Sequence, residues 1–442
     1  MVRPNLTYIA ATTPSAPATK KSNSSLKSSR RSANKTTRTA VSPSKPKPVS
    51  RTIIPGFVPD MLYLPRTVDA WPWQRTVNPA CDEARRESNE WFYAFHPFSP
   101  EALRAFDKCD LGLLAALAYP TISKEQLRSG CDLMNLFFVV DEYTDLQSGD
   151  SVRETIDIVR DALAHPEKPR PEGEILLGQV VKEFWQRAIR NSTPAAQKHF
   201  LSAFRDHLAS IIVQAGDRDR RYIRTVNEYI HMRRDNIGIR PSFFPGSMNL
   251  DIPMMGLLSL SIMLRIWSRS TTYVFREPSA LLAGLVYSIA DSFVSQDVAS
   301  YNKEQASDDA DCNIVTILMH QFQTDYTGAV EWVARHHAEL ERAFLSLAQE
   351  LPVRLRRSGV VVTPYVQDQL SQFVRVLGNW PRANDAWTFE SYRYFGSKGA
   401  EVQQTRVVKR TPKKIVDKNA AAAVPHPNAP VNVAASAIVA VN

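Results

Sequence analysis

The 442-residue sequence lacks several features that would assign it to common functional classes. No uninterrupted apolar run approaches the roughly 20 residues that span a bilayer, so no transmembrane segment is predicted. Cys81, Cys109, Cys131 and Cys312 show neither CxxC nor Cys/His spacing, and reduced thiols in a cytoplasmic protein are the expectation. Neither a Gly-x-Ser-x-Gly elbow nor a phosphate-cradling glycine loop occurs, which gives no support to a serine hydrolase or a P-loop protein.

Acidic residues are also missing from the first 59 positions, although lysine and arginine recur there. This stretch explains the net charge of +9, because the remainder of the chain is close to neutral. A basic tail supports nucleic-acid binding far less than a basic patch on a fold does, and no nucleic-acid partner is predicted. Residues 1–52 hold few large apolar side chains and are expected to be a disordered tail, with an organelle transit peptide as the alternative.

Helical signals fill the chain from residue 53 to residue 397. Ser99 stands before a proline and predicts a helix start, and Ser123 with Gln126 forms a capping box. Apolar residues recur every three or four positions, and no convincing alternating strand is found. The prediction is a single all-α domain over 53–397, followed by a second disordered tail, rich in Ala, Val and Pro, over 398–442.

The most informative stretch is an apolar run that ends in three carboxylates, Asp141, Glu142 and Asp145. On a helix, Asp141 and Asp145 are four residues apart and share one face. Burying such a pair without a partner costs on the order of several kcal/mol, so a nearby cation is expected. Carboxylates at this spacing suit Mg²⁺, which shares its other positions with water and substrate phosphates. A helix that simply emerges into solvent at Asp141 is the alternative.

A second polar stripe follows an apolar helical segment. Gln296, Ser300 and Glu304 recur at intervals of four, so an amide, a hydroxyl and a carboxylate line one face of a helix. These oxygen donors predict the protein half of another Mg²⁺ site, and the adjacent Lys303 offers a compact cation for a phosphate oxygen. An ordinary solvated helix face is the alternative interpretation.

Taken together, the two stretches resemble the metal-binding motifs of class I terpene synthases, particularly the fungal sesquiterpene synthases of mushrooms. The aspartate-rich motif of that family is similar to residues 141–145, and its Asn/Asp-Asp-x-x-Ser-x-x-x-Glu motif is similar to residues 296–304. The resemblance extends from about residue 53 to residue 396 and preserves the order and the separation of the motifs.

Two further motifs support the resemblance. Arg234, followed four residues later by Gly238, matches the family's diphosphate-sensing arginine and its helix-breaking glycine. Arg393 and Tyr394 match its closing Arg-Tyr pair near the end of the domain. The resemblance implies that Gly238 breaks its helix so that backbone carbonyl dipoles face a carbocation.

The resemblance implies a helical bundle that removes diphosphate from a prenyl diphosphate, farnesyl diphosphate above all, and cyclises the carbocation with three Mg²⁺ ions. The implied metal ligands are Asp141, Asp145, Gln296, Ser300 and Glu304. The implied diphosphate contacts are Arg234, Lys303, Arg393 and Tyr394. Phe138 and Trp387 are candidates for the wall of the hydrocarbon pocket, and each could equally be a plain core aromatic.

One position departs from the family pattern, because Gln296 stands where the family has Asn or Asp. Its amide oxygen is displaced by one methylene, whereas Mg²⁺ requires near-octahedral ligands at about 2.0–2.1 Å. Two outcomes follow from the sequence: either the helix is set back to accommodate the longer side chain, or one metal ion binds more weakly.

Three alternatives stay open at this point. A chain-elongating prenyltransferase would carry a second aspartate-rich motif where residues 296–304 stand, and the sequence has none there. The other two alternatives are not enzymes. One is a metal-compromised homologue without catalysis, and the other is a helical module recruited through the basic tail to an acidic partner. The protein is expected to be a monomer or a homodimer.

Overall fold

The computed structural model describes residues 54–145, 147–251 and 278–413, and nearly every element in these ranges is helical. The predicted all-α class is therefore confirmed, and among the described helices none is long and apolar enough to cross a membrane. The α-helices are α1 (Cys81–Tyr93), α2 (Pro100–Asp107), α3 (Leu111–Ala118), α4 (Lys124–Thr144), α5 (Gly149–Ala164), α6 (Leu177–Ala188), α7 (Pro194–Arg220), α8 (Val226–Asn236), α9 (Ile239–Ser242), α10 (Phe244–Ser247), α12 (Pro278–Ser292), α13 (Val294–Ser307), α14 (Ile314–Phe322), α15 (Tyr326–Arg357), α16 (Pro364–Glu390) and α17 (Gly399–Thr405). Short 3₁₀ turns are η1 (Ile189–Asn191), η3 (Ala310–Cys312) and η4 (Gly396–Lys398).

Polar side chains begin the helices that carry the candidate residues. The Ser123 hydroxyl accepts a hydrogen bond from the backbone N–H of Gln126, and the Gln126 side chain accepts one from the Ser123 N–H, so the predicted capping box of α4 is confirmed. Thr225 and Glu228 form the same device at the start of α8. These contacts satisfy N–H groups that the first helical turn leaves without an intrahelical partner.

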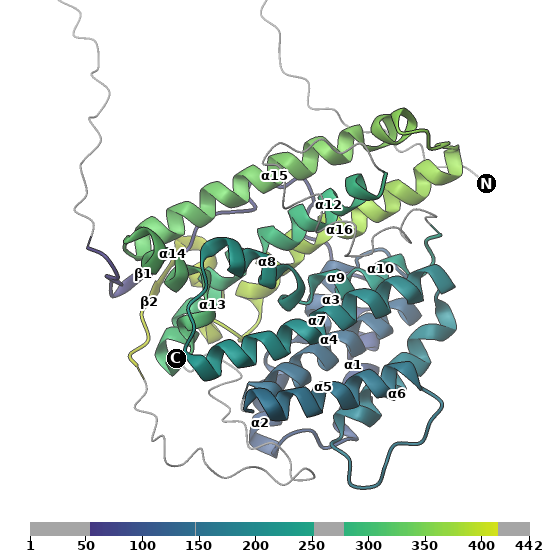
Figure 1. Ribbon diagram of the computed structural model, residues 1–442, viewed down its shortest axis with the longest axis horizontal. Coiled ribbons are helices and arrows are strands. Elements are labelled where there is room, and N and C mark those ends of the chain that lie inside the picture. The colour runs from purple at the N-terminus through teal and green to yellow at the C-terminus, as the bar shows by residue number, and fades with distance from the viewer. Residues whose placement is uncertain (1–53, 146, 252–277, 414–442) are drawn as a thin grey trace, which may run out of the picture. The chain divides into compact units, whose positions relative to one another are not determined.

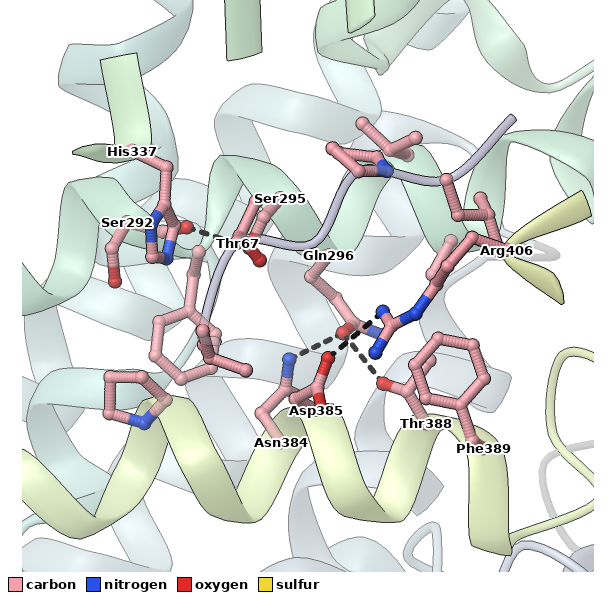
Figure 2. A pocket seen from close by; sticks show the side chains of 17 residues that line it. Thr67, Ser292, Ser295, Gln296, His337, Asn384, Asp385, Thr388, Phe389 and Arg406 are labelled. Atoms are coloured by element: carbon pink, nitrogen blue, oxygen red, sulfur yellow. Dashed lines mark hydrogen bonds and ion pairs between the residues drawn. The ribbon is translucent and has the colours of Figure 1, made fainter. Parts of the chain in front are cut away.

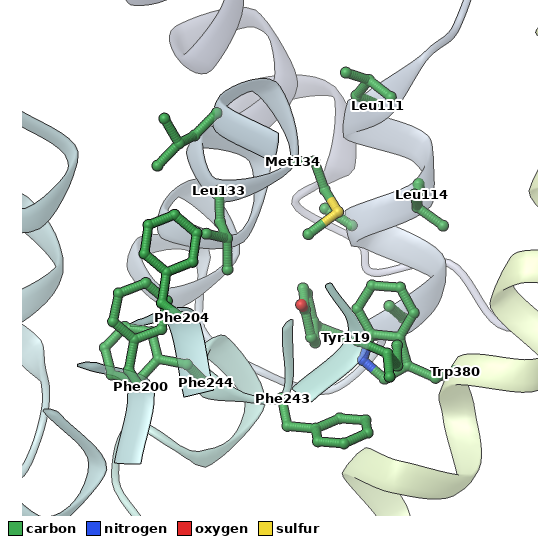
Figure 3. Close-up of a cluster of buried hydrophobic side chains, with 14 of the residues drawn as sticks. Leu111, Leu114, Tyr119, Leu133, Met134, Phe200, Phe204, Phe243, Phe244 and Trp380 are labelled. Atoms are coloured by element: carbon green, nitrogen blue, oxygen red, sulfur yellow. The ribbon is translucent and has the colours of Figure 1, made fainter. Parts of the chain in front are cut away.

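The larger apolar core surrounds α4, which packs against α1, α3 and α6 (Figure 1). On one side α5 covers α6 and α7, and on the other α16 packs on α3 and on α12, which lies along α15. Figure 3 shows Leu133 and Met134 of α4 among aromatic side chains from other helices, including Phe200 and Phe244. Because α4 is buried almost to its end, its last turn carries the carboxylates directly out of this core.

A second apolar cluster supports the other polar stripe. It joins α8, α13 and α14 to the first turns of α15, and Val298 and Tyr301 are among the α13 residues buried in it. Ser300 and Glu304 lie around the helix from these two side chains, because successive residues are about 100° apart. Apolar packing on one face of α13 therefore turns its hydroxyl and carboxylate toward polar surroundings.

Two short strands hold the ends of the described chain together, and they were not predicted. β1 (Met61–Tyr63) pairs antiparallel with β2 (Val407–Lys409), with Leu62 opposite Val408. Three residues give too little alternation for a strand to be predicted from sequence. The expectation of disorder from residue 398 is thus wrong for α17 and β2, because buried packing and this pairing order them. Residues 1–53 and 414–442, where the tails were expected, lie outside the described residues.

Candidate active site

The last turn of α4 presents the first pair of predicted ligands. The Asp141 and Asp145 side chains are 54% and 44% exposed, whereas Val139 and Val140 are fully buried. The backbone N–H of Asp145 donates to the Asp141 carbonyl at 2.9 Å, so the two carboxylates lie one helical turn apart. Partial burial, together with the charge of Glu142 beside Asp141 and of Asp141 beside Asp145, raises the pKa of both carboxyl groups. A cation bound here would relieve that repulsion.

Arg393, just beyond the end of α16, lies against the same turn of α4. Its Nη1 donates to Glu142 Oε1 at 2.8 Å, and its Nη2 is 3.8 Å from Asp141 Oδ2. The guanidinium carbon lies 5.1 Å from the centre of the Phe138 ring. Burial disfavours the charge of Arg393, but Glu142 and its other neighbours outweigh burial and raise the pKa of the guanidinium group.

The two predicted wall aromatics pack against this arginine and its neighbour. The Phe138 and Trp387 rings meet edge to face at 5.8 Å, and Trp387 meets Tyr394 in the same manner at 5.9 Å. The Trp387 indole N–H donates to the Cys109 carbonyl at 2.6 Å, which fixes the ring. The structure therefore brings Phe138, Trp387, Arg393 and Tyr394 together beside Asp141.

On α13, the side chains of Ser300 and Glu304 share a partner, Asn313, which caps α14. The Asn313 amide N–H₂ donates to Glu304 Oε2 at 2.8 Å and lies 3.5 Å from Ser300 Oγ. Burial and the charge of Asp297 raise the pKa of Glu304 to about 7, although the hydrogen bonds oppose this shift. Its surroundings disfavour the charged form of this carboxylate, and a bound divalent cation would stabilise that form.

Lys303 connects the two acidic stretches. Burial and the charge of Arg393 lower the pKa of its ammonium group, while Glu142, Asp141 and Asp145 oppose the shift. These interactions mean that Lys303, on α13, lies within electrostatic reach of the carboxylates at the end of α4. Asp141 and Lys303 are more than 150 positions apart in the sequence. Their interaction indicates that the two stretches face a common region.

The structure separates Gln296 from the other predicted ligands of its helix. Gln296 Oε1 accepts hydrogen bonds from Asn384 Nδ2 at 2.6 Å and from Thr388 Oγ1 at 3.2 Å, both on α16 (Figure 2). The pocket in Figure 2 is lined by these three residues, and within the described chain neither Ser300 nor Glu304 belongs to its lining. The amide oxygen therefore faces α16, and the predicted three-residue ligand set is not formed as expected.

Arg234, the predicted diphosphate sensor, is buried and paired with an aspartate. It makes a bidentate ion pair with Asp291 at 2.5 and 2.8 Å, and its guanidinium carbon lies 5.1 Å from the centre of the Tyr287 ring. A bidentate arginine–carboxylate pair is among the stronger polar contacts in proteins. The ion pair uses Nε and Nη2, so a diphosphate would have to be contacted through the remaining guanidinium N–H groups or in exchange for Asp291.

The preceding residue, Arg233, lies closer to the acidic stretches. It pairs with Asp297 at 2.8 Å, while its charge lowers the pKa of Asp141 and the charge of Glu304 raises its own. Its Nε is buried and has no hydrogen-bond partner among the described residues. Sequence reasoning did not assign this residue, because two adjacent arginines point about 100° apart and only one matches the family spacing.

The predicted helix break at Gly238 is confirmed. α8 ends at Asn236, Gly238 adopts φ +71°, and α9 begins at Ile239. A side chain here would be strained by that backbone conformation. The Gly238 carbonyl accepts hydrogen bonds from the Ser242 N–H at 3.3 Å and the Ser242 hydroxyl at 2.7 Å, so it already has partners.

Several residues that sequence reasoning did not assign complete the site: Glu142, Arg218, Arg233, Asp291, Asp309 and Asn313. Arg218, from α7, lies 3.5 Å from Asp145 and donates to the carbonyls of Thr144 and Gln147 at the end of α4. Burial raises the pKa of Asp309, which interacts with Arg218 and Asp141. Glu142 had a signal in the sequence because it lies inside the first acidic stretch, and Asp309 belongs to an acidic run that sequence alone favours as a solvated helix end.

Most of the predicted ligands carry atoms that suit the implied Mg²⁺ ions. Asp141, Asp145, Ser300 and Glu304 offer hard oxygen atoms of the type that Mg²⁺ prefers. Within the described ranges, no three His, Cys, Asp or Glu side chains converge into a metal cage. Asp141, Asp145, Ser300 and Glu304 therefore fit a site that shares its metal ions with a phosphate ligand. Gln296 does not fit, because its amide oxygen accepts hydrogen bonds from α16.

Comparison with known proteins agrees with this geometry. Residues 132–343 match the family model described as terpene synthase family 2, C-terminal metal binding. Sesquiterpene synthase 14 of Postia placenta is 47% identical over 360 residues, which cover 81% of this chain and 95% of that protein. Delta(6)-protoilludene synthase 18 of the same fungus is 44% identical over 361 residues, covering 82% of this chain and 95% of that protein.

Solved structures share the fold at much lower identity. α-Eudesmol synthase superposes with a TM-score of 0.59 at 17% identity, over 72% of this chain and 97% of that one. A variant of cucumene synthase gives 0.57 at 18% identity, over 72% of this chain and 98% of that one. With the order of the motifs, the matched family model and the close fungal relatives in agreement, the chain belongs to the class I terpene synthases, among the fungal sesquiterpene synthases.

Proposed function

We propose that this protein uses Mg²⁺ to ionise farnesyl diphosphate and cyclises the carbocation to a sesquiterpene. The observation that supports this most is the position of Arg393, which donates to Glu142 on α4 at 2.8 Å and lies 3.8 Å from Asp141, while the charges of both carboxylates act on Lys303 of α13. Two oxygen-rich helices and two cations that face one region make a site for a polyanion and its metal ions. The relatives named sesquiterpene synthase give the fifteen-carbon substrate its support.

The metal ions would be held by Asp141 and Asp145 on one side and by Ser300 and Glu304 on the other. Bound there, Mg²⁺ supplies positive charge to the departing phosphate oxygens, which is the largest requirement of the ionisation step. The count of three ions is part of the proposal. Asn313 would hold the Glu304 carboxylate in place through its 2.8 Å hydrogen bond.

The leaving group would be bound by Lys303, Arg393, Tyr394 and Arg234, the last of which Asp291 orients through Nε and Nη2. One unit-charge pair at 4 Å contributes about 4 kcal/mol at an effective dielectric constant of 20, and a diphosphate forms several such pairs. Arg393 is well placed because Glu142 holds one edge of its guanidinium group while its other nitrogen lies 3.8 Å from Asp141. Arg233 adds a further cation, whose charge interacts with Asp141 and Glu304.

The hydrocarbon would be guided by Phe138 and Trp387. A cation over an aromatic ring gains about 0.5–2 kcal/mol, too little to drive ionisation but enough to favour one position of the charge over another. Arg393 lies over one face of the Phe138 ring and Trp387 packs against the ring, so substrate would contact the part of Phe138 that these two side chains leave uncovered. Gly238, whose carbonyl is already bonded to Ser242, would act mainly by ending α8 beside Arg234.

The test is a product assay with purified protein, Mg²⁺ and prenyl diphosphates of ten, fifteen and twenty carbons. We expect a cyclic fifteen-carbon hydrocarbon or alcohol by gas chromatography with mass detection, and none after chelation of the metal. Delta(6)-protoilludene is a useful reference compound, since relatives carry that name. Longer prenyl chains after addition of isopentenyl diphosphate would instead identify a prenyltransferase, and the absence of any product would identify a non-catalytic homologue.

A further inference from the structure

The side chain of Gln296 is built into a polar link between α13 and α16. It is 7% exposed, and its Oε1 accepts hydrogen bonds from Asn384 Nδ2 at 2.6 Å and Thr388 Oγ1 at 3.2 Å. Asn384 and Thr388 are four residues apart, so they lie on one face of α16, and Figure 2 shows both pointing at the Gln296 amide. Burial raises the pKa of the Tyr394 hydroxyl group, and the neighbouring Gln296 side chain opposes that rise.

These contacts use the atoms that a metal ion would need. An amide oxygen has two lone pairs, and Asn384 and Thr388 supply two hydrogen-bond donors to it. Coordination of Mg²⁺ would require both hydrogen bonds to break and would leave two buried donors without an acceptor, which is costly. An asparagine in this position would end about 1.5 Å short of α16, the length of one carbon–carbon bond. The longer glutamine is therefore suited to bridge the two helices.

We propose that Gln296 is a positioning residue that ties the metal-binding helix to the diphosphate-binding segment, and that α13 contributes Ser300 and Glu304, without Gln296, to metal binding. The inference rests on the proposed function for the identity of the ligands. α16 ends at Glu390, and Arg393 and Tyr394 follow within one turn's length of chain. A link to Asn384 and Thr388, near the end of α16, thus positions the segment from which the Arg393 side chain extends.

This role predicts a separation of two effects. Loss of the link should loosen Arg393 and Tyr394, and thereby raise the KM for farnesyl diphosphate about tenfold. The Mg²⁺ concentration for half-maximal activity should change less than twofold. A ligand of the metal gives the opposite pattern, with its main effect on the Mg²⁺ concentration that is needed.

The first experiment is a double-mutant cycle on thermal unfolding, which requires no substrate. Gln296→Met keeps the length of the side chain and removes its polar atoms, and Thr388→Val removes one donor with little change of shape. We expect each variant to lower the unfolding temperature and the double variant to lower it no further than Gln296→Met alone. Fully additive shifts would overturn the link, and Asn384→Ala gives a second cycle if the Thr388→Val variant does not fold.

The second experiment measures binding of Mn²⁺ in the presence of inorganic diphosphate by electron paramagnetic resonance. Gln296→Met should bind Mn²⁺ within twofold of the unmodified protein, whereas Ser300→Ala, the matched variant on the same face of α13, should weaken binding at least tenfold. Equal weakening in both variants would show that Gln296 is a ligand. If the unmodified protein neither binds Mn²⁺ nor turns over farnesyl diphosphate, the proposed function fails, and the unfolding cycle still decides whether the link exists.

Discussion

The two acidic stretches of this protein offer similar oxygen chemistry but differ in how far their side chains are committed to other residues. At the end of α4, the closest cations lie 3.8 Å from Asp141 and 3.5 Å from Asp145, and both carboxylates are about half exposed. On α13, Glu304 is held by Asn313 at 2.8 Å, and Gln296 by Asn384 at 2.6 Å. One stretch is open to a ligand, and the other is fixed by amide groups before any ligand arrives.

The difference follows from what lies beneath each helix. α4 emerges from an apolar core, and burial together with neighbouring carboxylates raises the pKa values of Asp141 and Asp145. α13 lies over a smaller cluster and is surrounded by amides, hydroxyls and the buried Arg233–Asp297 pair. We expect the α4 carboxylates to supply most of the charge that attracts metal ions, and the α13 residues to supply geometry.

The largest effect is expected from Asp141→Asn, which removes charge from the open stretch and keeps the shape of the side chain. Product formation from farnesyl diphosphate should fall by about 10³-fold, because about 4 kcal/mol of interaction is lost and each 1.36 kcal/mol is tenfold in rate. Steady-state turnover with saturating Mg²⁺ measures this. Asp157→Asn, which changes an exposed ion pair on α5, is the control and should keep normal turnover. Comparable activity in both variants would contradict the assignment of Asp141.

A smaller loss is expected from Glu304→Gln, on α13, where Asn313 already holds the carboxylate. Glutamine keeps an oxygen beside Asn313 and Ser300 but removes the negative charge, so turnover should fall by about 100-fold and recover in part at high Mg²⁺. The measurement is the Mg²⁺ dependence of product formation. A loss that equals that of Asp141→Asn and does not respond to Mg²⁺ would remove the distinction drawn here between the two stretches.

Asn313→Ala tests the hydrogen bond that holds the Glu304 carboxylate. The variant loses a hydrogen bond to a charged group, for which about 1.5 kcal/mol is typical, so the Mg²⁺ concentration for half-maximal activity should rise about tenfold. Asn313 also caps α14, and its loss will lower the unfolding temperature. Thr363→Ala is the matched control because it removes only a helix cap, that of α16. The prediction is wrong if both variants shift the Mg²⁺ dependence alike.

The smallest effect concerns pH and stability. The pKa of Glu304 is about 7 in the folded protein, against an ordinary value of 4.5, so the folded state binds more protons than the unfolded state between these values. Its contribution to stability is therefore present at low pH and declines as the pH rises toward 7. Relative to Glu304→Gln, the unmodified protein without metal should lose about 2–4 °C of unfolding temperature between pH 5 and pH 8. A pH-independent difference, measured by calorimetry, would rule this out.

Local signals in the sequence were sufficient for much of the fold. The capping box at Ser123 and the break at Gly238 depend on neighbouring residues, and both are found where predicted. The direction of Gln296 was beyond reach, because its partners lie on α16, 88 and 92 positions away along the chain. The choice between Arg233 and Arg234 likewise depends on Asp297 and Asp291, whose placement follows from packing between helices.

The β1–β2 pair has a practical meaning for anyone who shortens this protein. Beyond Thr405, the carbonyl groups of Lys409 and Thr411 accept hydrogen bonds from the side chains of Asn302 and Gln305. This clasp, formed by residues 407–411, holds the C-terminal segment against α13. A protein cut after residue 397 would retain all residues of both acidic stretches and still lose this clasp. We expect such a truncation to produce a weakened enzyme whose defect could be mistaken for a missing ligand.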